Sequence, residues 1–404
     1  MKIAFFLENI QFGGLDTFII NLLNSWDKND ELILICNSSH PGLNLLKGKL
    51  NNRVRVMGHY VPLTWDLDRY FNFPGFVLKI MKFVYFMIAI PIQVYLLKKF
   101  FKQNKFDKLM VVNGGYPGGD SCLSASIAWG KLYPCNKAWH NFHNLAYSKN
   151  DYTGIEKLKY FRSILIDIVL KKYVEGFISV SKSSINSLNI RDEFKNNKKE
   201  YIYNGINIDV DLDNTISIKE KFNLPQNAKV ISVLGVYEPR KGQEFIIKVF
   251  RKIYEQDKNI YLFMFGKGES SYVEYLKELI GGNKNIFLED YQEEIKQIYK
   301  GTDILAIPSQ SLESFGYTAV EAMAYNIPII ATDIGGLPEV VEDNICGYIV
   351  KKDDIDGFIQ KIIFLCREDS LREKFGINGD KRYEKLFRAK IMSNKYEKLI
   401  KWRV

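Results

Sequence analysis

After residue 207, short apolar runs alternate regularly with amphipathic segments, and this alternation constrains the fold more than any other feature of the chain. The apolar runs are too short for helices and are typical of buried strands, whereas the segments between them repeat apolar residues at the spacing of a helix face. Predicted strands cover 230–234, 260–265, 286–288, 304–307, 328–331 and 348–350, and predicted helices cover 243–254, 272–279, 293–300 and 318–325. Strands joined through helices run parallel, which predicts a doubly wound α/β sheet.

The first half of the chain shows a looser form of the same alternation. An apolar run at 3–7 is followed by a loop that carries Gly13 and Gly14, and then by a helical segment at 18–23. Further buried strands are predicted at 32–36, 109–112 and 176–180. Ligands of such sheets bind beyond the carboxyl ends of the strands, so the loops that follow the strands are where function is expected.

A chain of 404 residues with one clear break in its periodicity predicts two domains. The break lies near 205–220, where Asn204-Gly205 and several aspartates interrupt the apolar pattern. The expected limits are 1–207 for the first α/β domain and 208–380 for the second. A charged amphipathic helix over 381–404 is expected to pack back toward the first domain.

The cysteines and the N-terminus indicate the cellular compartment. Five cysteines without a CxxC pair predict neither a zinc module nor a disulfide framework. The apolar run at 3–7 is too short for the core of a secretory signal. A cytoplasmic location is therefore expected.

Basic residues are concentrated in the first half. Up to residue 207 the chain has 27 basic and 16 acidic residues, against 29 and 31 afterwards. Such an excess favours an anionic partner: nucleic acid, a phospholipid surface or a phosphorylated substrate. No nucleic-acid recognition motif accompanies it, so we expect no nucleic-acid partner.

One segment of the first half is unusually apolar. Residues 83–97 contain no charge, but these fifteen residues fall short of the roughly 18 that a spanning helix needs. A basic run follows, with Lys98, Lys99, Lys102, Lys105 and Lys108. Two interpretations remain open: a helix that lies on an anionic membrane surface, which we favour, or a buried core helix with a solvated basic end.

The loop after the strand at 230–234 carries adjacent cations. Arg240 and Lys241 precede a predicted helix, where the helix dipole already favours anions. This arrangement suits a diphosphate, although an isolated pair of this kind is more often a solvated basic turn.

A pair of glutamates marks the loop after 304–307. Glu313 lies in the loop and Glu321 stands eight positions later on the following helix. A carboxylate can accept hydrogen bonds from two vicinal sugar hydroxyls. Backbone N–H groups near Phe315 and Gly316, at the start of the helix, are suited to phosphate or sugar oxygens.

These residues together resemble a known family. The sequence is similar to glycosyltransferases of the GT-B architecture, which have two Rossmann-like βαβ domains facing each other across a cleft, and in particular to the retaining family GT4 with its E-x7-E motif. The matching motifs are Glu313 to Glu321, then Pro328, Gly335-Gly336 and Glu339, and before them Asn204-Gly205-Ile206, Pro239 to Gly242 and Gly266-Lys267-Gly268. They cover most of residues 200–350.

The resemblance implies a role for each matching residue. Glu313 would contact the donor sugar, Glu321 the ribose hydroxyls, and Lys241 with Arg240 the diphosphate. The remaining implied site residues are Ser314, Phe315, Gly316 and Gly266 around the donor, Gly13 and Gly14 beside its phosphates, and His140 near its sugar. Two positions depart from the family pattern: Val236 stands where an arginine is frequent and Lys267 where an acidic residue is common.

The expected function is retaining transfer of a hexosyl or N-acetylhexosaminyl group from a nucleotide sugar, with a UDP-sugar favoured, to a hydroxyl acceptor. The acceptor is expected to be a lipid-linked oligosaccharide in bacterial surface polysaccharide synthesis, and the protein to be peripheral at the inner face of the cell membrane. We expect no metal or other cofactor, because fixed cations can replace Mg²⁺ and the Asp209-Val210-Asp211 sequence lies in the predicted linker. The alternative is a non-catalytic nucleotide-sugar-binding subunit. A Rossmann dehydrogenase fits less well, because the glycines from Gly266 lack the third one of its fingerprint.

Overall fold

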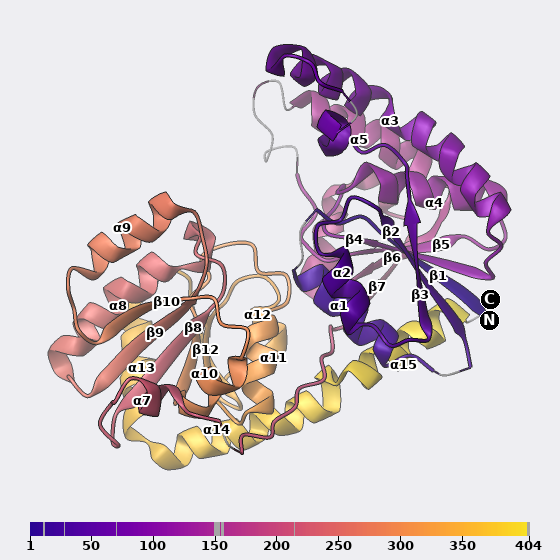
Figure 1. Ribbon diagram of the computed structural model, residues 1–404. Helices are drawn as coiled ribbons and strands as arrows, with labels where there is room; N and C mark the ends of the chain where they lie inside the picture. Colours follow the sequence, from indigo (N-terminus) through magenta and orange to yellow (C-terminus); the bar gives the residue numbers. More distant parts are fainter. Residues whose placement is uncertain are drawn as a thin grey trace. The chain divides into compact units, whose positions relative to one another are not determined.

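The chain folds into two compact units (Figure 1). The computed structural model describes residues 1–401 except 11–12, 28, 70, 149–153, 155–156 and 214. The first unit comprises Met1–Gly205 together with the C-terminal segment from Ala389, and the second comprises Ile206–Arg388. The chain therefore passes between the units twice.

The first unit is built on a seven-stranded parallel sheet with the order β3-β2-β1-β4-β5-β6-β7. Its strands are β1 (Lys2–Leu7), β2 (Glu31–Asn37), β3 (Val54–His59), β4 (Lys108–Asn113), β5 (Ala138–Phe142), β6 (Val174–Ser179) and β7 (Lys198–Tyr201). Its helices are α1 (Gly14–Asn24), α2 (Leu43–Lys49), α3 (Gly75–Gln103), α4 (Asp120–Leu132), α5 (Lys157–Leu170), α6 (Lys182–Ser187) and α15 (Ala389–Lys401).

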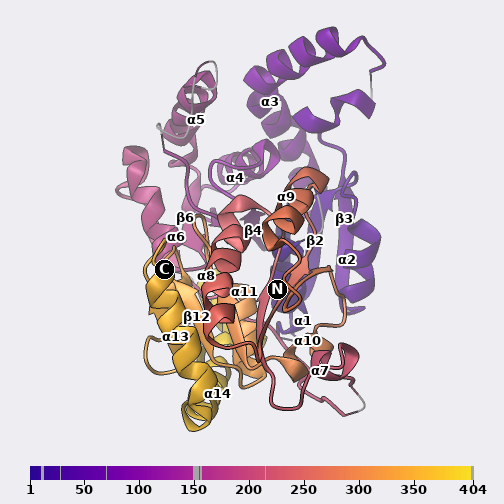
Figure 2. The same cartoon turned by 90° about the vertical axis from the view of Figure 1, so that its left-hand side faces the viewer.

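Alternating side chains of the strands feed two hydrophobic cores, one on each face of this sheet. Phe6 of β1 packs on one face with Leu97 and Phe101 of α3. Its neighbour Phe5 points to the other face, where Phe18 of α1 and Tyr396 of α15 lie. The two faces of the sheet are thus covered by different helices, and Figure 2 shows α3, α4 and α5 on one side of the unit.

The second unit contains a six-stranded parallel sheet with the order β10-β9-β8-β11-β12-β13. The strands are β8 (Lys229–Leu234), β9 (Ile260–Gly266), β10 (Ile286–Asp290), β11 (Ile304–Ile307), β12 (Ile329–Thr332) and β13 (Gly347–Val350). The helices are α7 (Ile218–Lys221), α8 (Gln243–Gln256), α9 (Ser270–Ile280), α10 (Ile295–Gly301), α11 (Tyr317–Ala324), α12 (Leu337–Val340), α13 (Ile355–Arg367) and α14 (Asp369–Arg382).

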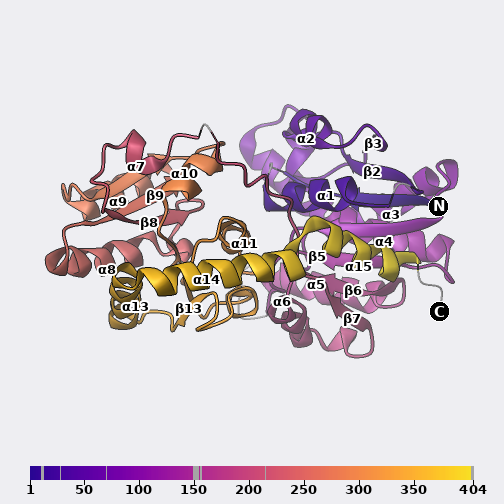
Figure 3. The same ribbon diagram turned by 90° about the horizontal axis from the view of Figure 1, so that it is seen from below.

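The predicted fold class is confirmed: both units are α/β with parallel sheets. The limits of the units differ from the expected ones, because α14 and the turn that follows it stay with the second unit up to Arg388. Only α15 packs on the first unit, beside α1 (Figure 3). Residues 402–404 of the expected C-terminal helix lie outside the described residues.

The apolar segment 83–97 is part of α3, which is much longer than the uncharged run. By length and composition, α3 is the one helix among the described residues that could cross a membrane. Its C-terminal half places Val94, Leu97 and Phe101 in the core, whereas its N-terminal half leaves large apolar side chains such as Phe76 exposed. The buried-core interpretation fits the C-terminal half of α3, whereas contact of the exposed N-terminal half with a membrane surface stays a prediction.

Candidate functional site

Three loops of the second unit meet at one edge of its sheet. They follow β8, β11 and β12, which are adjacent and parallel, so their carboxyl ends lie side by side. This is the edge at which doubly wound sheets bind ligands. The loops contain most of the site residues expected from the sequence.

Lys241 and Glu313 form an ion pair between two of these loops. Lys241 ends the short 3₁₀ turn Pro239–Lys241, and its Nζ lies 2.6 Å from Oε2 of Glu313. The Ser309 hydroxyl donates a hydrogen bond of 3.1 Å to the same carboxylate oxygen. The Glu313 side chain is buried and the Lys241 side chain is partly exposed. A cation and a carboxylate are thus held together at the strand ends.

Arg240 is directed differently from Lys241. Its guanidinium donates a 3.1 Å hydrogen bond to the carbonyl of Leu312 and pairs with Glu238. In this arrangement Arg240 braces the loop that carries Glu313. Its charge remains near the ion pair but is shared with a carboxylate.

Two glycines allow the loops to approach each other closely. Gly335 has a φ of +59°, and a Cβ on it would stand 1.8 Å from the carbonyl oxygen of Glu313. The next residue, Gly336, donates its N–H to that same carbonyl at 2.8 Å. Gly242 has a φ of +76°, and its Cβ would meet the Pro308 carbonyl. Only glycine satisfies both the backbone angle and the space at these positions.

Glu321 lies on α11 and is held by a tyrosine of the neighbouring helix. The Tyr299 hydroxyl of α10 donates to Oε2 of Glu321 at 2.8 Å. The Tyr299 ring stacks on that of Tyr325, with 4.9 Å between ring centroids. Burial raises the pKa of Glu321 to about 7, although the hydrogen bond from Tyr299 opposes this shift. Sequence reasoning missed Tyr299, because no pattern links α10 to α11.

The residues between the two glutamates shape the start of α11. Phe315 is buried and packs against the rings of Tyr317 and Phe387, so its side chain anchors the loop. Gly316 caps α11 with a φ of +97°. Ser314 lies between Glu313 and this anchor, and its carbonyl lies against Gly336.

Gly266 ends β9 and contacts the loop after β8. A Cβ on Gly266 would stand 1.9 Å from the carbonyl of Gly235. Of the two residues that depart from the family pattern, Val236 is half-exposed in this loop. Lys267 lies above the ring of Tyr291. Gly266 therefore acts through backbone packing.

In the first unit, Gly13 precedes α1 and its N–H donates to Asp16 at 2.9 Å. Asp16 is fully buried, and its second oxygen lies 2.9 Å from Nε2 of His40. Gly14 is the first residue of α1. Asp16, which the sequence analysis did not single out, thus holds the glycine loop in place.

The structure places His140 in the core. It lies within β5 with no exposed surface, and its Nδ1 and Nε2 face Ser126 at 2.9 Å and Asn113 at 3.5 Å. Burial lowers its pKa to about 3, so the ring is neutral. The prediction that His140 contacts a donor sugar is therefore wrong, because a side chain enclosed by the sheet does not reach a ligand.

His143, three residues later, stands just beyond the carboxyl end of β5. Its ring packs edge-on against Phe18 of α1 at 4.2 Å. Its Nε2 has no hydrogen-bond partner among the described residues, and burial lowers its pKa to about 3. His143 thus has a neutral ring at the carboxyl end of β5, and its unpartnered Nε2 is buried there.

No metal site emerges from the part of the chain that the structure describes: no three His, Cys, Asp or Glu side chains gather there. Asp209, which begins the Asp-x-Asp sequence, pairs with Lys296 at 2.5 Å.

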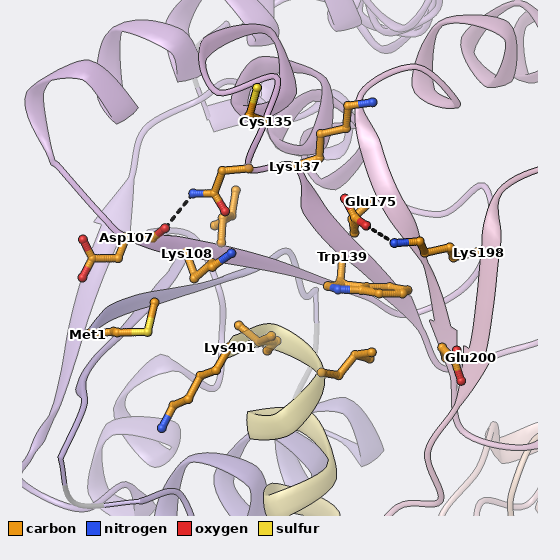
Figure 4. Close-up of a pocket in the computed structure, with 14 residues that line it drawn as sticks. Met1, Asp107, Lys108, Cys135, Lys137, Trp139, Glu175, Lys198, Glu200 and Lys401 are labelled. Carbon is orange, nitrogen blue, oxygen red and sulfur yellow. Dashed lines mark hydrogen bonds and ion pairs between the residues drawn. The ribbon is translucent and has the colours of Figure 1, made fainter. Parts of the chain in front are cut away.

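The first unit has a large hollow of about 930 Å³ (Figure 4). It borders the amino ends of strands of the first unit, where Lys108 and Lys198 begin β4 and β7, and Trp139 lines it. None of the expected site residues lines this hollow.

Residues 214–382 match the family model of glycosyl transferases group 1. This segment lies within the second unit and includes Lys241, Glu313 and Glu321. Relatives include the capsular polysaccharide biosynthesis glycosyltransferase CapM of Staphylococcus aureus, 28% identical over 61% of this chain and 66% of CapM. An uncharacterized glycosyltransferase of Methanocaldococcus jannaschii is 30% identical over 52% of this chain and 55% of its own length. The chain spans less than two thirds of each of these relatives.

Similar solved structures cover both units. HepE of Anabaena, solved with UDP, has a TM-score of 0.74 at 15% identity, over 99% of each chain. A glycosyltransferase of Rickettsia africae has a TM-score of 0.73 at 19% identity, over 98% of this chain and 97% of the other. The chain has the GT-B fold. Within this GT-B protein, the segment that matches the glycosyl transferases group 1 model contains the loops described above.

Proposed function

We propose that this GT-B protein transfers a sugar, with retention at the anomeric carbon, from a nucleotide-sugar donor to a hydroxyl acceptor. The observation that carries the proposal is the ion pair of Lys241 and Glu313 at the carboxyl ends of adjacent strands, inside the segment that matches the glycosyl transferases group 1 model. A fixed cation at such an edge suits a diphosphate, and a carboxylate suits sugar hydroxyls.

The proposed step needs no covalent enzyme intermediate. The acceptor oxygen forms a bond to the anomeric carbon while the bond from that carbon to the diphosphate breaks. The leaving diphosphate takes the acceptor proton, and Lys241 stabilises the negative charge that develops on it. Arg240 adds a second, shared cation, so we propose that the reaction requires no metal ion. EDTA should then leave the rate unchanged.

Glu321 is proposed to hold the donor ribose. Its carboxylate is oriented by Tyr299 and can accept two vicinal hydroxyls. UDP is the favoured nucleotide, since HepE, which shares this fold, was solved with UDP and with UDP-glucose.

The acceptor is proposed to be a lipid-linked oligosaccharide of a bacterial surface polysaccharide. CapM, a relative, is named for capsular polysaccharide biosynthesis, and the first unit carries the basic excess expected beside an anionic lipid.

The deciding experiment is a screen of nucleotide sugars for nucleotide release by the purified chain, with and without a membrane-lipid extract. Acceptor-dependent release supports the proposal. Binding of a nucleotide sugar without any turnover would instead favour a non-catalytic subunit.

We also propose that the protein works in the cytoplasm, bound peripherally to the inner face of the membrane. The exposed apolar side chains of the N-terminal half of α3, including Phe76, Ile80 and Val84, would lie in the headgroup region. Vesicles of anionic lipid should sediment the protein at low salt, and added salt should release part of it. A protein that stays in the supernatant under both conditions would contradict this location.

A further inference from the structure

We propose that a hollow between α3, α4 and α5 binds the hydrocarbon chain of the lipid acceptor. This inference rests on the proposed function, because it assigns a binding site to the lipid part of the acceptor. We call it the α3–α5 hollow, and it is lined by Met87 and Val94 of α3, Ile127 of α4, and Phe161, Leu165 and Val169 of α5, among others.

The size and lining of the α3–α5 hollow suit an apolar ligand. Its volume of about 540 Å³ lies within the range of sites for small molecules. Phe161 and Leu165 are 65% and 52% exposed although they face this concave surface. Apolar side chains of this size gain free energy when a hydrocarbon covers them, at roughly 25 cal/mol per Å² removed from water.

Charge complementarity indicates what the rest of the ligand is. The charged side chains in the lining are Lys131 and Arg162, which are both cationic. Two further exposed lysines, Lys157 and Lys159, stand in the first turn of α5. A chain that ends in a phosphate or diphosphate fits an apolar floor that has lysines at its border.

Arg162 connects the hollow to the functional edge of the first sheet. Its guanidinium stacks on Phe86 of α3, 3.9 Å from the ring centroid, and donates two hydrogen bonds to Asp120 at 2.9 and 3.0 Å. Asp120 is the first residue of α4, which follows the carboxyl end of β4. Asp120 already shares the charge of the buried Arg162, so we place the phosphate beside the exposed Lys157 in the first turn of α5. Arg162 ties this part of α5 to the edge where acceptors are expected.

The hollow is distinct from the general apolar surface around it. Ile88 of α3 and Ile168 of α5 are 49% and 41% exposed but do not line it. If this surface only contacted a flat bilayer, the exposed apolar residues that line the hollow and those outside it would contribute equally to binding. A site for a single chain depends only on the lining residues.

Two substitutions at one lining position separate these cases. Leu165→Asn removes apolar surface from the hollow, and Leu165→Trp adds apolar surface while filling it. Ile168→Asn on the same helix is the matched control. Leu165 and Ile168 are both about half exposed, so the variants should fold, which circular dichroism and thermal unfolding verify.

The probe is geranylgeranyl phosphate, titrated into the full chain, with inorganic phosphate as the head-group control. The wild-type protein and Ile168→Asn should bind the probe alike, and both Leu165 variants should bind it at least fivefold more weakly. Inorganic phosphate should not compete at similar concentrations. Equal affinity in all four proteins, or full competition by inorganic phosphate, would overturn the proposal.

Sedimentation with anionic vesicles and donor turnover complete the test. Leu165→Trp should sediment with vesicles at least as well as the wild type while losing the probe. If its affinities for vesicles and probe rise together, the surface serves the bilayer alone and the hollow is not a chain site. Hydrolysis of the nucleotide sugar without acceptor should be unchanged in the control variant Ile168→Asn. Absence of donor turnover in the wild type would contradict the proposed function without affecting the binding result.

Discussion

The ammonium of Lys241 lies 2.6 Å from the Glu313 carboxylate, so the two residues expected to contact different parts of a donor are bonded to each other. A diphosphate beside Lys241 would compete with Glu313 for the same N–H groups. Donor binding would thereby release the carboxylate to face the sugar. The ion pair holds both side chains in position until that happens.

Replacing Lys241 tests this relationship. Lys241→Ala should lower the rate of sugar transfer by about 10²–10³-fold, because the developing diphosphate charge loses its fixed cation. The Lys252→Ala variant, which removes a lysine from an exposed ion pair with Asp356, is the control and should keep its activity. Steady-state kinetics with both variants would measure the effect, and a wild-type rate in Lys241→Ala would refute the assignment.

Tyr299→Phe should raise the KM for the nucleotide sugar by about tenfold and leave kcat nearly unchanged. The phenyl ring keeps the packing of a buried side chain, but the carboxylate of Glu321 loses its donor, a loss of about 1.5 kcal/mol for a charged acceptor. Tyr325→Phe is the matched control, because its hydroxyl donates to the backbone carbonyl of Asp209 and Glu321 accepts from Tyr299 instead. An equal rise of KM in both variants would show that the hydrogen bond to Glu321 has no specific role in donor binding.

Donor affinity should increase as the pH rises through about 7. Burial raises the pKa of Glu321 to about this value, and the ionised carboxylate is the better acceptor for ribose hydroxyls. The KM measured between pH 5.5 and 8.5 should therefore fall across this window in the wild type. In Glu321→Gln the KM should be higher and independent of pH in the same range.

The raised pKa of Glu321 also makes the free energy of unfolding decrease as the pH rises. The pKa of Glu321 is about 7 in the folded state against 4.5 for an ordinary glutamate, so its contribution to stability is full below pH 4.5 and is lost as the pH rises through 7. Glu321→Gln should then gain up to about 3 kcal/mol relative to the wild type at pH 8, and nothing at pH 4. Urea unfolding at both pH values measures this, with exposed Glu293→Gln as the control.

Gly335→Ala should damage both the fold and the site. The new methyl group would collide with the Glu313 carbonyl at a backbone φ of +59°, so the loop has to move. We expect the free energy of unfolding to fall by about 1–3 kcal/mol and donor affinity to fall with it. Gly282→Ala also replaces a glycine of positive φ, but with open space around it, and should lose stability without losing donor affinity.

Much of the second unit could be predicted because its information is local. An apolar run such as 304–307 between helical segments predicts a buried parallel strand, and β11 has these bounds. Once such strands are predicted, the loops that follow them can be predicted as the ligand-binding loops, because ligands bind beyond the carboxyl ends of parallel strands. Strands β3, β5 and β7 were not predicted, because they lack an uninterrupted apolar run. In β7, for example, all four side chains are polar or aromatic.

Some of the site residues could also be predicted from the sequence, and others could not. Lys241, Glu313 and Glu321 could be singled out from residue type, spacing and family resemblance. His140 could not be distinguished from His143 by sequence, because a shift of three residues along a strand and its loop decides which ring is enclosed by the sheet and which stands at its end.

The sequence by itself determined the fold class, the two-unit division and the identity of the residues at the strand ends, because periodicity and turn chemistry act between neighbours along the chain. Only the tertiary structure decided that Lys241 pairs with Glu313, that Tyr299 orients Glu321 and that α5 joins α3 around a hollow. These partners are distant in the sequence, and the packing of helices on the sheets brings them together. A hydrogen bond or a concave surface depends on that packing in three dimensions.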